Sequence, residues 1–188
     1  MGRLKIVILI AGYGLLFALS PQGQSRTVKC DSSLGLANMA PTLQAKGRLQ
    51  EAGWAPQTMH ILELNKKAIP LLIGCLTDKT RTKEPIEDYW PVTTVGDIAF
   101  IYLCDLFTDS TWKHSTIDGV VNWQTLESEY PNEPSWSAWY SFVRKHGRKH
   151  VQSVWANKWK EEEAAIFWDD KEKCFKVGPR STQKDDRP

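Results

Sequence analysis

The sequence predicts a mainly helical protein with a central pair of apolar helices, a long tryptophan-rich third helix and a small C-terminal β-hairpin. Three observations lead to this prediction. Two dense apolar segments at helical spacing flank a polar, proline-containing insert within residues 66–109. Tryptophans and other apolar residues recur at helical spacing between residues 135 and 163. Beyond residue 163 the pattern changes to two short apolar runs on either side of a charged turn, which is typical of a hairpin.

The composition is that of an ordered chain. Of the 188 residues, 41% are hydrophobic and 24% are charged, as in globular proteins rather than disordered ones. Arg3 and Lys5 are the charged residues of the first 25, so 22 basic and 22 acidic residues remain after them. This even balance argues against nucleic acid as a partner, because nucleic-acid binders carry a basic excess.

The first 25 residues match a secretory signal peptide. Arg3 and Lys5 precede an uncharged apolar run from Ile6 to Leu19, and small residues precede a cut after Ser25. The run is shorter than the roughly 20 residues that a membrane span needs. We therefore expect cleavage, no stable membrane span afterwards, and an exported protein that is periplasmic or secreted.

Export changes the meaning of the four cysteines, Cys30, Cys75, Cys104 and Cys174. In an oxidising compartment they predict two disulfides, with three possible pairings. A direct bond between Cys75 and Cys104 is disfavoured, because an antiparallel helix pair places them more than a turn apart. Bridges from Cys30 and Cys174 to the central helices are favoured. The alternative is that Cys75 and Cys104 are buried small hydrophobic residues.

Residues 26–57, rich in glycine and proline, predict an irregular arm, and residues 58–177 a single, mainly helical domain. Thr58 is the expected cap of the first central helix, within which Pro70 predicts a kink or a restart.

The second central helix follows Thr94 and Asp97, which form a capping-box pattern. Its apolar residues lie on opposite sides, which predicts a buried, central helix.

The two central segments resemble a helical hairpin of HEAT-repeat proteins, over about a quarter of the chain. The matching residues are Ala68, Ile69, Pro70, Leu72, Ile73, Leu76 and Asp78 in the first helix, and Val95 to Ala99 with Leu103 in the second. The resemblance implies protein binding rather than catalysis.

The remaining segments complete the expected fold. Residues 110–134 are expected to form a loop, followed by a helix from Pro134 to about Glu163. Gly147 within that helix predicts either a close neighbour or a break into two helices. Residues 178–188 form a polar tail that we expect to be disordered.

Two segments are candidate binding sites. Asp88, Tyr89 and Trp90 combine an acid with two aromatic rings on the insert, with the alternative that the rings cover helix ends. The basic run 144–150 is a candidate site for a phosphate or an anionic lipid, with the alternative of a solvated basic face. Its candidate residues are Arg144, His146, Arg148, Lys149 and His150.

No metal and no cofactor is predicted. His146 and His150 have the spacing of metal ligands one turn apart, but Gly147 stands where the zincin pattern requires a glutamate. The sequence also shows no nucleophile-elbow, phosphate-loop or dinucleotide motif.

The function that follows is an exported, non-enzymatic binding protein whose partner is another protein or an envelope glycan. A glycan-binding module would require an exposed Trp90, Trp139 or Trp159. A secreted hydrolase that uses Asp88, Asp97 or the histidine pair also fits the size and export of the chain. So does a small immunity protein that inhibits an enzyme.

Overall fold

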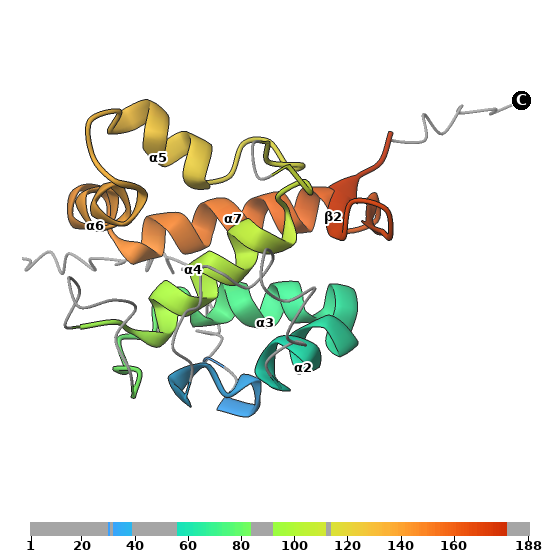
Figure 1. The fold of residues 1–188 in the computed structure, drawn as a ribbon, viewed down its shortest axis with the longest axis horizontal. Helices are drawn as coiled ribbons and strands as arrows, with labels where there is room; N and C mark the ends of the chain where they lie inside the picture. Colours follow the sequence, from blue (N-terminus) through green and yellow to red (C-terminus); the bar gives the residue numbers. More distant parts are fainter. Residues whose placement is uncertain (1–29, 31, 39–55, 84–91, 112–113, 180–188) are drawn as a thin grey trace, which may run out of the picture.

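The structure, a computed structural model, describes residues 30, 32–38, 56–83, 92–111 and 114–179. The expected signal peptide, most of the irregular arm, residues 180–188 of the tail, and Asp88, Tyr89 and Trp90 lie outside the described residues. The described chain is mainly helical and ends in a two-stranded antiparallel hairpin, which confirms the predicted fold class (Figure 1). Its elements are η1 (Ser32–Leu34), η2 (Leu36–Asn38), α2 (Pro56–Leu64), η3 (Asn65–Lys67), α3 (Ala68–Cys75), α4 (Val95–Leu106), α5 (Trp123–Glu129), α6 (Ser135–His146), α7 (Arg148–Glu162), β1 (Ile166–Asp169) and β2 (Cys174–Val177).

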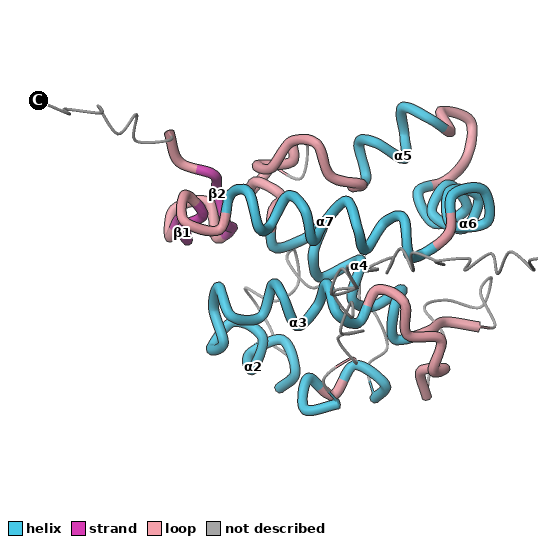
Figure 2. The backbone as a smooth tube through the Cα atoms, turned by 180° about the vertical axis from the view of Figure 1, so that it is seen from behind, coloured by secondary structure: helices cyan, strands magenta, loops and turns pink. Residues whose placement is uncertain are grey.

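Helix α4 forms the centre of the core, as its two apolar sides predict. Ten of its 12 residues are buried. Helix α3 packs against both α4 and α7, and α5 packs against α6. Figures 1 and 2 show α2 and α3 on one side of the molecule and α5 and α6 on the other, with the hairpin at the C-terminal end of α7.

The first apolar segment breaks earlier than Pro70, where the kink or restart was predicted. The break falls at Asn65, whose φ is 53°, and α3 then starts at Ala68. Pro70 is the third residue of α3, where the missing N–H would have no acceptor within the helix, so it does not disturb the helix. Thr58 was expected to cap this segment but lies inside α2, and its hydroxyl is hydrogen-bonded to that of Tyr102 at 2.8 Å.

The predicted third helix consists of two helices, α6 and α7, which meet at Gly147. Gly147 has a φ of 81°, in the region that favours glycine. No described atom lies within 4 Å of the position of a Cβ there, so the predicted break is confirmed and the predicted close neighbour is wrong.

Helix α5 replaces part of the loop that was expected for residues 110–134. Asn122 caps it, because its side-chain oxygen accepts a hydrogen bond from the backbone N–H of Thr125 at 2.9 Å. The helix has seven residues and one buried side chain, Leu126. A helix this short leaves too little periodicity to be recognised in the sequence.

The C-terminal hairpin is confirmed, with Ile166 paired to Val177 and Asp169 to Cys174. An isolated two-stranded hairpin is marginally stable, so it needs contacts with the helical body. Lys66 Nζ donates to the carbonyl oxygen of Ile166 at 3.0 Å, and the Thr116 hydroxyl donates to that of Phe175 at 2.5 Å. These contacts attach the hairpin to the helices.

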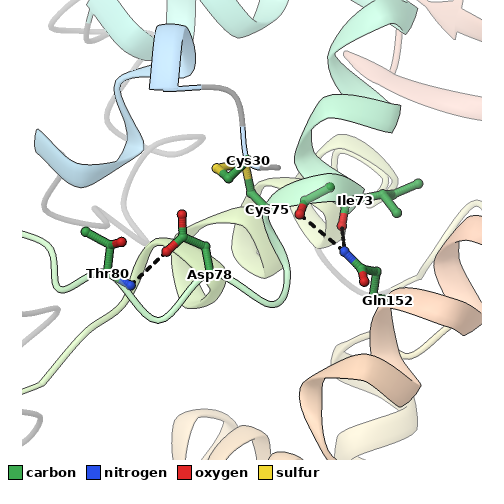
Figure 3. Close-up of a disulfide and its surroundings, with 7 residues drawn as sticks. Cys30, Ile73, Cys75, Asp78, Thr80 and Gln152 are labelled. Carbon is green, nitrogen blue, oxygen red and sulfur yellow. Dashed lines mark hydrogen bonds between the residues drawn. A yellow bond between two sulfur atoms is a disulfide. The ribbon is translucent and has the colours of Figure 1, made fainter. Parts of the chain in front are cut away.

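One disulfide joins Cys30 to Cys75 at the end of α3 (Figure 3). It is of the favoured kind, a bridge from a flanking cysteine to a central helix. The second predicted bridge is not formed, since Cys104 and Cys174 are buried thiols. Burial and the nearby Asp105 raise the pKa of the Cys104 thiol well above its usual value, which keeps this thiol protonated.

The disulfide is typical of proteins in oxidising compartments. Next to it, the Gln152 side chain of α7 donates to the carbonyl oxygens of Ile73 and Gly74 at 2.9 and 3.2 Å (Figure 3). These bonds satisfy acceptors in the last turn of α3. Among the described residues, no helix combines the length and the apolar character needed to cross a membrane.

Candidate functional site

The structure divides the basic run 144–150 between the surface and the interior. The run spans the junction of α6 and α7, where Gly147 changes the direction of the chain. Arg148 turns inward, and only 12% of its side chain is exposed. The exposed members are Arg144, Lys145, His146, Lys149 and His150.

Arg148 pairs with Asp97, the most deeply buried carboxylate of the described chain, with 0% exposure. Asp97 Oδ1 accepts hydrogen bonds from Arg148 Nη2 at 2.5 Å and from Trp139 Nε1 at 2.7 Å. Its Oδ2 accepts from the backbone N–H and the hydroxyl of Thr94, both at 2.8 Å, which confirms the predicted capping box. Four donors compensate a carboxylate that would be costly to bury alone. Asp97 therefore ties the start of α4 to α6 and α7.

The guanidinium of Arg148 occupies a narrow space beside the first turn of α4. A Cβ on Gly96 would lie 2.9 Å from Arg148 Nη1 and 2.6 Å from the carbonyl oxygen of Leu76, closer than normal contacts allow. The guanidinium lies 5.5 Å from the ring centre of Trp139, which stacks on Phe100 with centres 3.8 Å apart. Arg148 is therefore used inside the fold, in contrast to its predicted place in a surface anion site.

On the surface, Glu129 neutralises part of the basic run. Its Oε1 lies 2.8 Å from Lys145 Nζ and 2.9 Å from His146 Nε2. Hydrogen bonds from Lys145 and then from His146 lower the pKa of Glu129 to about 2. The ring centres of His146 and His150 lie 5.5 Å apart. No group of three or more His, Cys, Asp or Glu side chains in the described parts of the chain could hold a metal ion.

Of the three tryptophans that a glycan site would need, the structure places Trp139 in the core. Trp139 is fully buried, and Trp136 and Trp155 are buried with it. Trp159 is half-buried, with Lys66 Nζ at 6.0 Å from its ring centre. Trp90 lies outside the described residues.

A pocket that the sequence analysis did not predict lies between α2 and the β-hairpin. Its volume is about 280 Å³, and its described lining residues are Met59, Leu62, Asn65, Trp168, Lys173 and Phe175. We call it the α2–hairpin pocket. Its two walls come from segments about 100 residues apart, so no local pattern reveals it. The one local signal is Met59, a large apolar residue with 40% exposure on α2.

The walls of this pocket are held in place by contacts on both sides. On the hairpin side, Trp168 and Phe175 are paired across the two strands, and their rings meet edge to face with centres 5.0 Å apart. Phe175 is buried and also contacts Phe107 of the core. On the α2 side, Lys66 of the following turn bonds to strand β1. The pocket is therefore a feature of the folded body rather than of a loop.

A second pocket, of about 310 Å³, lies beside the disulfide. Its one charged lining residue among those described is Asp78, whose Oδ1 accepts from the backbone N–H of Thr80 at 2.8 Å (Figure 3). Its other described lining residues are Cys30, Ser32, Gly35, Leu36, Ala37, Asn38, Thr80 and Val95, which are small or already part of the core. The α2–hairpin pocket, in contrast, combines four apolar side chains with an asparagine and a lysine.

Comparison with known proteins does not indicate a function for this chain. No protein-family model, no curated protein and no solved structure matches this chain. The resemblance of residues 66–109 to a HEAT hairpin therefore stays a prediction. Function has to be argued from the residues and their geometry.

Replacing Asp97 by asparagine should strongly destabilise the protein. The change leaves Arg148 as a buried charge without its partner, which typically costs about 3–5 kcal/mol of unfolding free energy. Urea unfolding followed by circular dichroism measures this value. Glu127→Gln, at an exposed position on α5, is the matched control and should change stability by less than about 0.5 kcal/mol. Equal effects of the two changes would contradict the structural role of Asp97.

Glu129→Gln should change the pH dependence of stability. The folded-state pKa of about 2 lies below the ordinary value of 4.5, so the stabilisation by Glu129 is present above pH 4.5 and is lost as the pH falls toward 2. The melting temperatures of the two proteins should therefore differ most above pH 4.5 and converge near pH 2. A difference that stays constant from pH 2 to pH 6 would show that the ion pairs of Glu129 do not contribute.

Proposed function

We propose that this chain is an exported, non-enzymatic binding protein that binds its ligand in the α2–hairpin pocket. The observation that carries the proposal is the composition of that pocket. Four apolar side chains form its walls, while Asn65 and Lys173 add two polar groups. Mostly apolar walls with a few placed polar groups are the common chemistry of ligand sites.

Export is supported by the disulfide between Cys30 and Cys75. Both cysteines follow the predicted signal peptide, so they would remain in the mature chain. Disulfides form and persist in the periplasm and outside the cell, where a signal peptide would deliver the chain.

A binding role rather than catalysis is supported by how the chemically capable side chains are used. Asp97, a candidate acid for hydrolysis, is fully buried and accepts four hydrogen bonds. His146, of the candidate histidine pair, shares Glu129 with Lys145. A general acid or base has to reach its substrate, and a carboxylate enclosed in the core cannot do so.

The export part of this proposal predicts the redox state of the cysteines. When the full chain is expressed with residues 1–25 in an exporting bacterial host, the mature protein should contain one disulfide and two thiols. Alkylation under denaturing conditions followed by mass spectrometry counts the thiols. The same chain expressed from residue 26 in a reducing cytosol is the control and should contain four thiols. Recovery of the full chain uncleaved and fully reduced would contradict export.

The binding part predicts that a small apolar probe occupies the α2–hairpin pocket. The neutral fluorophore N-phenyl-1-naphthylamine should bind the wild-type protein with one site. Met59→Trp should abolish this binding, because the larger ring fills the pocket at an exposed position that tolerates substitution.

Phe167→Ser is the control for this experiment. Phe167 is 48% exposed and adjacent to Trp168, but it points to the opposite face of strand β1 and does not line the pocket. Binding should be unchanged in this variant. Probe binding that survives Met59→Trp, or no binding to the wild type, would overturn the assignment of the pocket.

A further inference from the structure

The α2–hairpin pocket combines an apolar interior with a positively charged residue in its lining. We propose that it binds a small apolar molecule with one anionic oxygen head group, such as a medium-chain carboxylate, with the head group at Lys173. This inference rests on the proposed function, because it names the ligand class of the same pocket.

The apolar side chains of the pocket indicate that the body of the ligand is apolar. Met59 and Leu62 form the wall on α2, and Trp168 and Phe175 form the wall on the hairpin. The flexible methionine side chain adapts to different apolar shapes. The volume of about 280 Å³ lies just under the range of about 300–1,000 Å³ that is common for drug-sized ligands. A small molecule therefore fits better than a polymer.

Lys173 sets the charge of the head group. It is the charged residue among the described lining, and its side chain is 62% exposed. Its ion-pair partner is Asp170, whose Oδ1 lies 3.5 Å from Lys173 Nζ and also accepts a hydrogen bond from Trp168 Nε1 at 3.1 Å. The Asp170 side chain is 87% exposed. Pairs this exposed contribute little to stability, so a ligand anion can replace Asp170 at the ammonium group.

Asn65 adds a second donor to the same pocket. Its side-chain oxygen already accepts the backbone N–H of Lys66 at 2.6 Å. The NH₂ group of Asn65 is a donor that can bind an oxygen atom of a ligand. With an ammonium group and an amide donor in the lining, an oxygen anion is the complementary head group.

The backbone conformation at Lys173 supports a role in binding. Asn65 and Lys173 have φ values of 53° and 52°, in the left-handed region. Asparagine tolerates this region, but a hairpin turn normally places glycine at such a position, so a lysine there is strained. Strain of this kind concentrates at ligand sites. The lysine provides a charge that the unstrained glycine would lack.

A cationic ligand fits the pocket less well. The Trp168 ring could attract a cation through its π face. However, Lys173 would repel a second positive charge in the same pocket. Lys173 is the charged group of the described lining, so an anion is favoured once the Asp170 carboxylate moves away from the ammonium group.

Two dyes with the same ring system separate the head group from the apolar body. The anionic dye is 1-anilinonaphthalene-8-sulfonate, and the neutral dye is N-phenyl-1-naphthylamine. Lys173→Gln should weaken binding of the anionic dye about tenfold, as expected for one exposed bond to a charged group. The same change should leave the neutral dye within about twofold. Octanoate should displace the anionic dye, whereas octylammonium at equal concentration should not.

Lys171→Gln is the matched control, because Lys171 is exposed on the same turn but does not line the pocket. It should change neither affinity. Equal weakening by the two lysine changes would mean general surface charge and would overturn the assignment of the head group. So would displacement by a peptide with a free C-terminal leucine but not by octanoate, which would indicate a protein partner.

The design also separates this inference from the proposed function. If both dyes bind, both are lost in Met59→Trp and neither responds to Lys173→Gln, the pocket is a binding site but its ligand is not an anion. If neither dye responds to Met59→Trp, the proposed function itself is wrong.

Discussion

The fold depends on one buried carboxylate. Asp97 is fully enclosed and accepts hydrogen bonds from Thr94 at its own helix start, from Trp139 of α6 and from Arg148 of α7. A charge in the core is tolerated only with its partners in place, so these three helices are held in one relative arrangement. Gly96 belongs to the same constraint, because any side chain there would collide with Arg148 and the end of α3. Asp97 is thus a local cap and also the polar centre around which the helices assemble.

The change of chain direction at Gly147 decides what the basic run does. After Gly147 a new helix, α7, begins at Arg148, whose guanidinium reaches Asp97 in the core. The preceding residues end α6 on the surface, where Glu129 binds Lys145 and His146. The basic run therefore stabilises the fold at two places, in the core through Arg148 and on the surface through Lys145 and His146. The positive charge that lines the α2–hairpin pocket, in contrast, comes from Lys173.

The α2–hairpin pocket owes its existence to how the chain ends. The hairpin is too small to be stable alone, and aromatic contacts and hydrogen bonds fix it against the helices. That attachment places Trp168 and Phe175 opposite α2 and leaves a space between them. The disulfide holds a different part of the molecule, since it joins Cys30 to the end of α3. The proposed binding function can therefore be tested directly at the α2–hairpin pocket.

The sequence by itself determined the helical class, the buried central helix, the capping box of Thr94 and Asp97 and the C-terminal hairpin, and it left the break at Gly147 as one of two alternatives. These features rest on interactions within a few residues or on the spacing of apolar residues, which a sequence displays directly. Tertiary structure alone decided that Arg148 turns inward, that Cys30 pairs with Cys75 while Cys104 and Cys174 remain thiols, and that a pocket forms between α2 and the hairpin. Each of these joins residues about 45 to 115 positions apart. Such contacts depend on how the helices pack in three dimensions, and no local pattern in the chain records that arrangement.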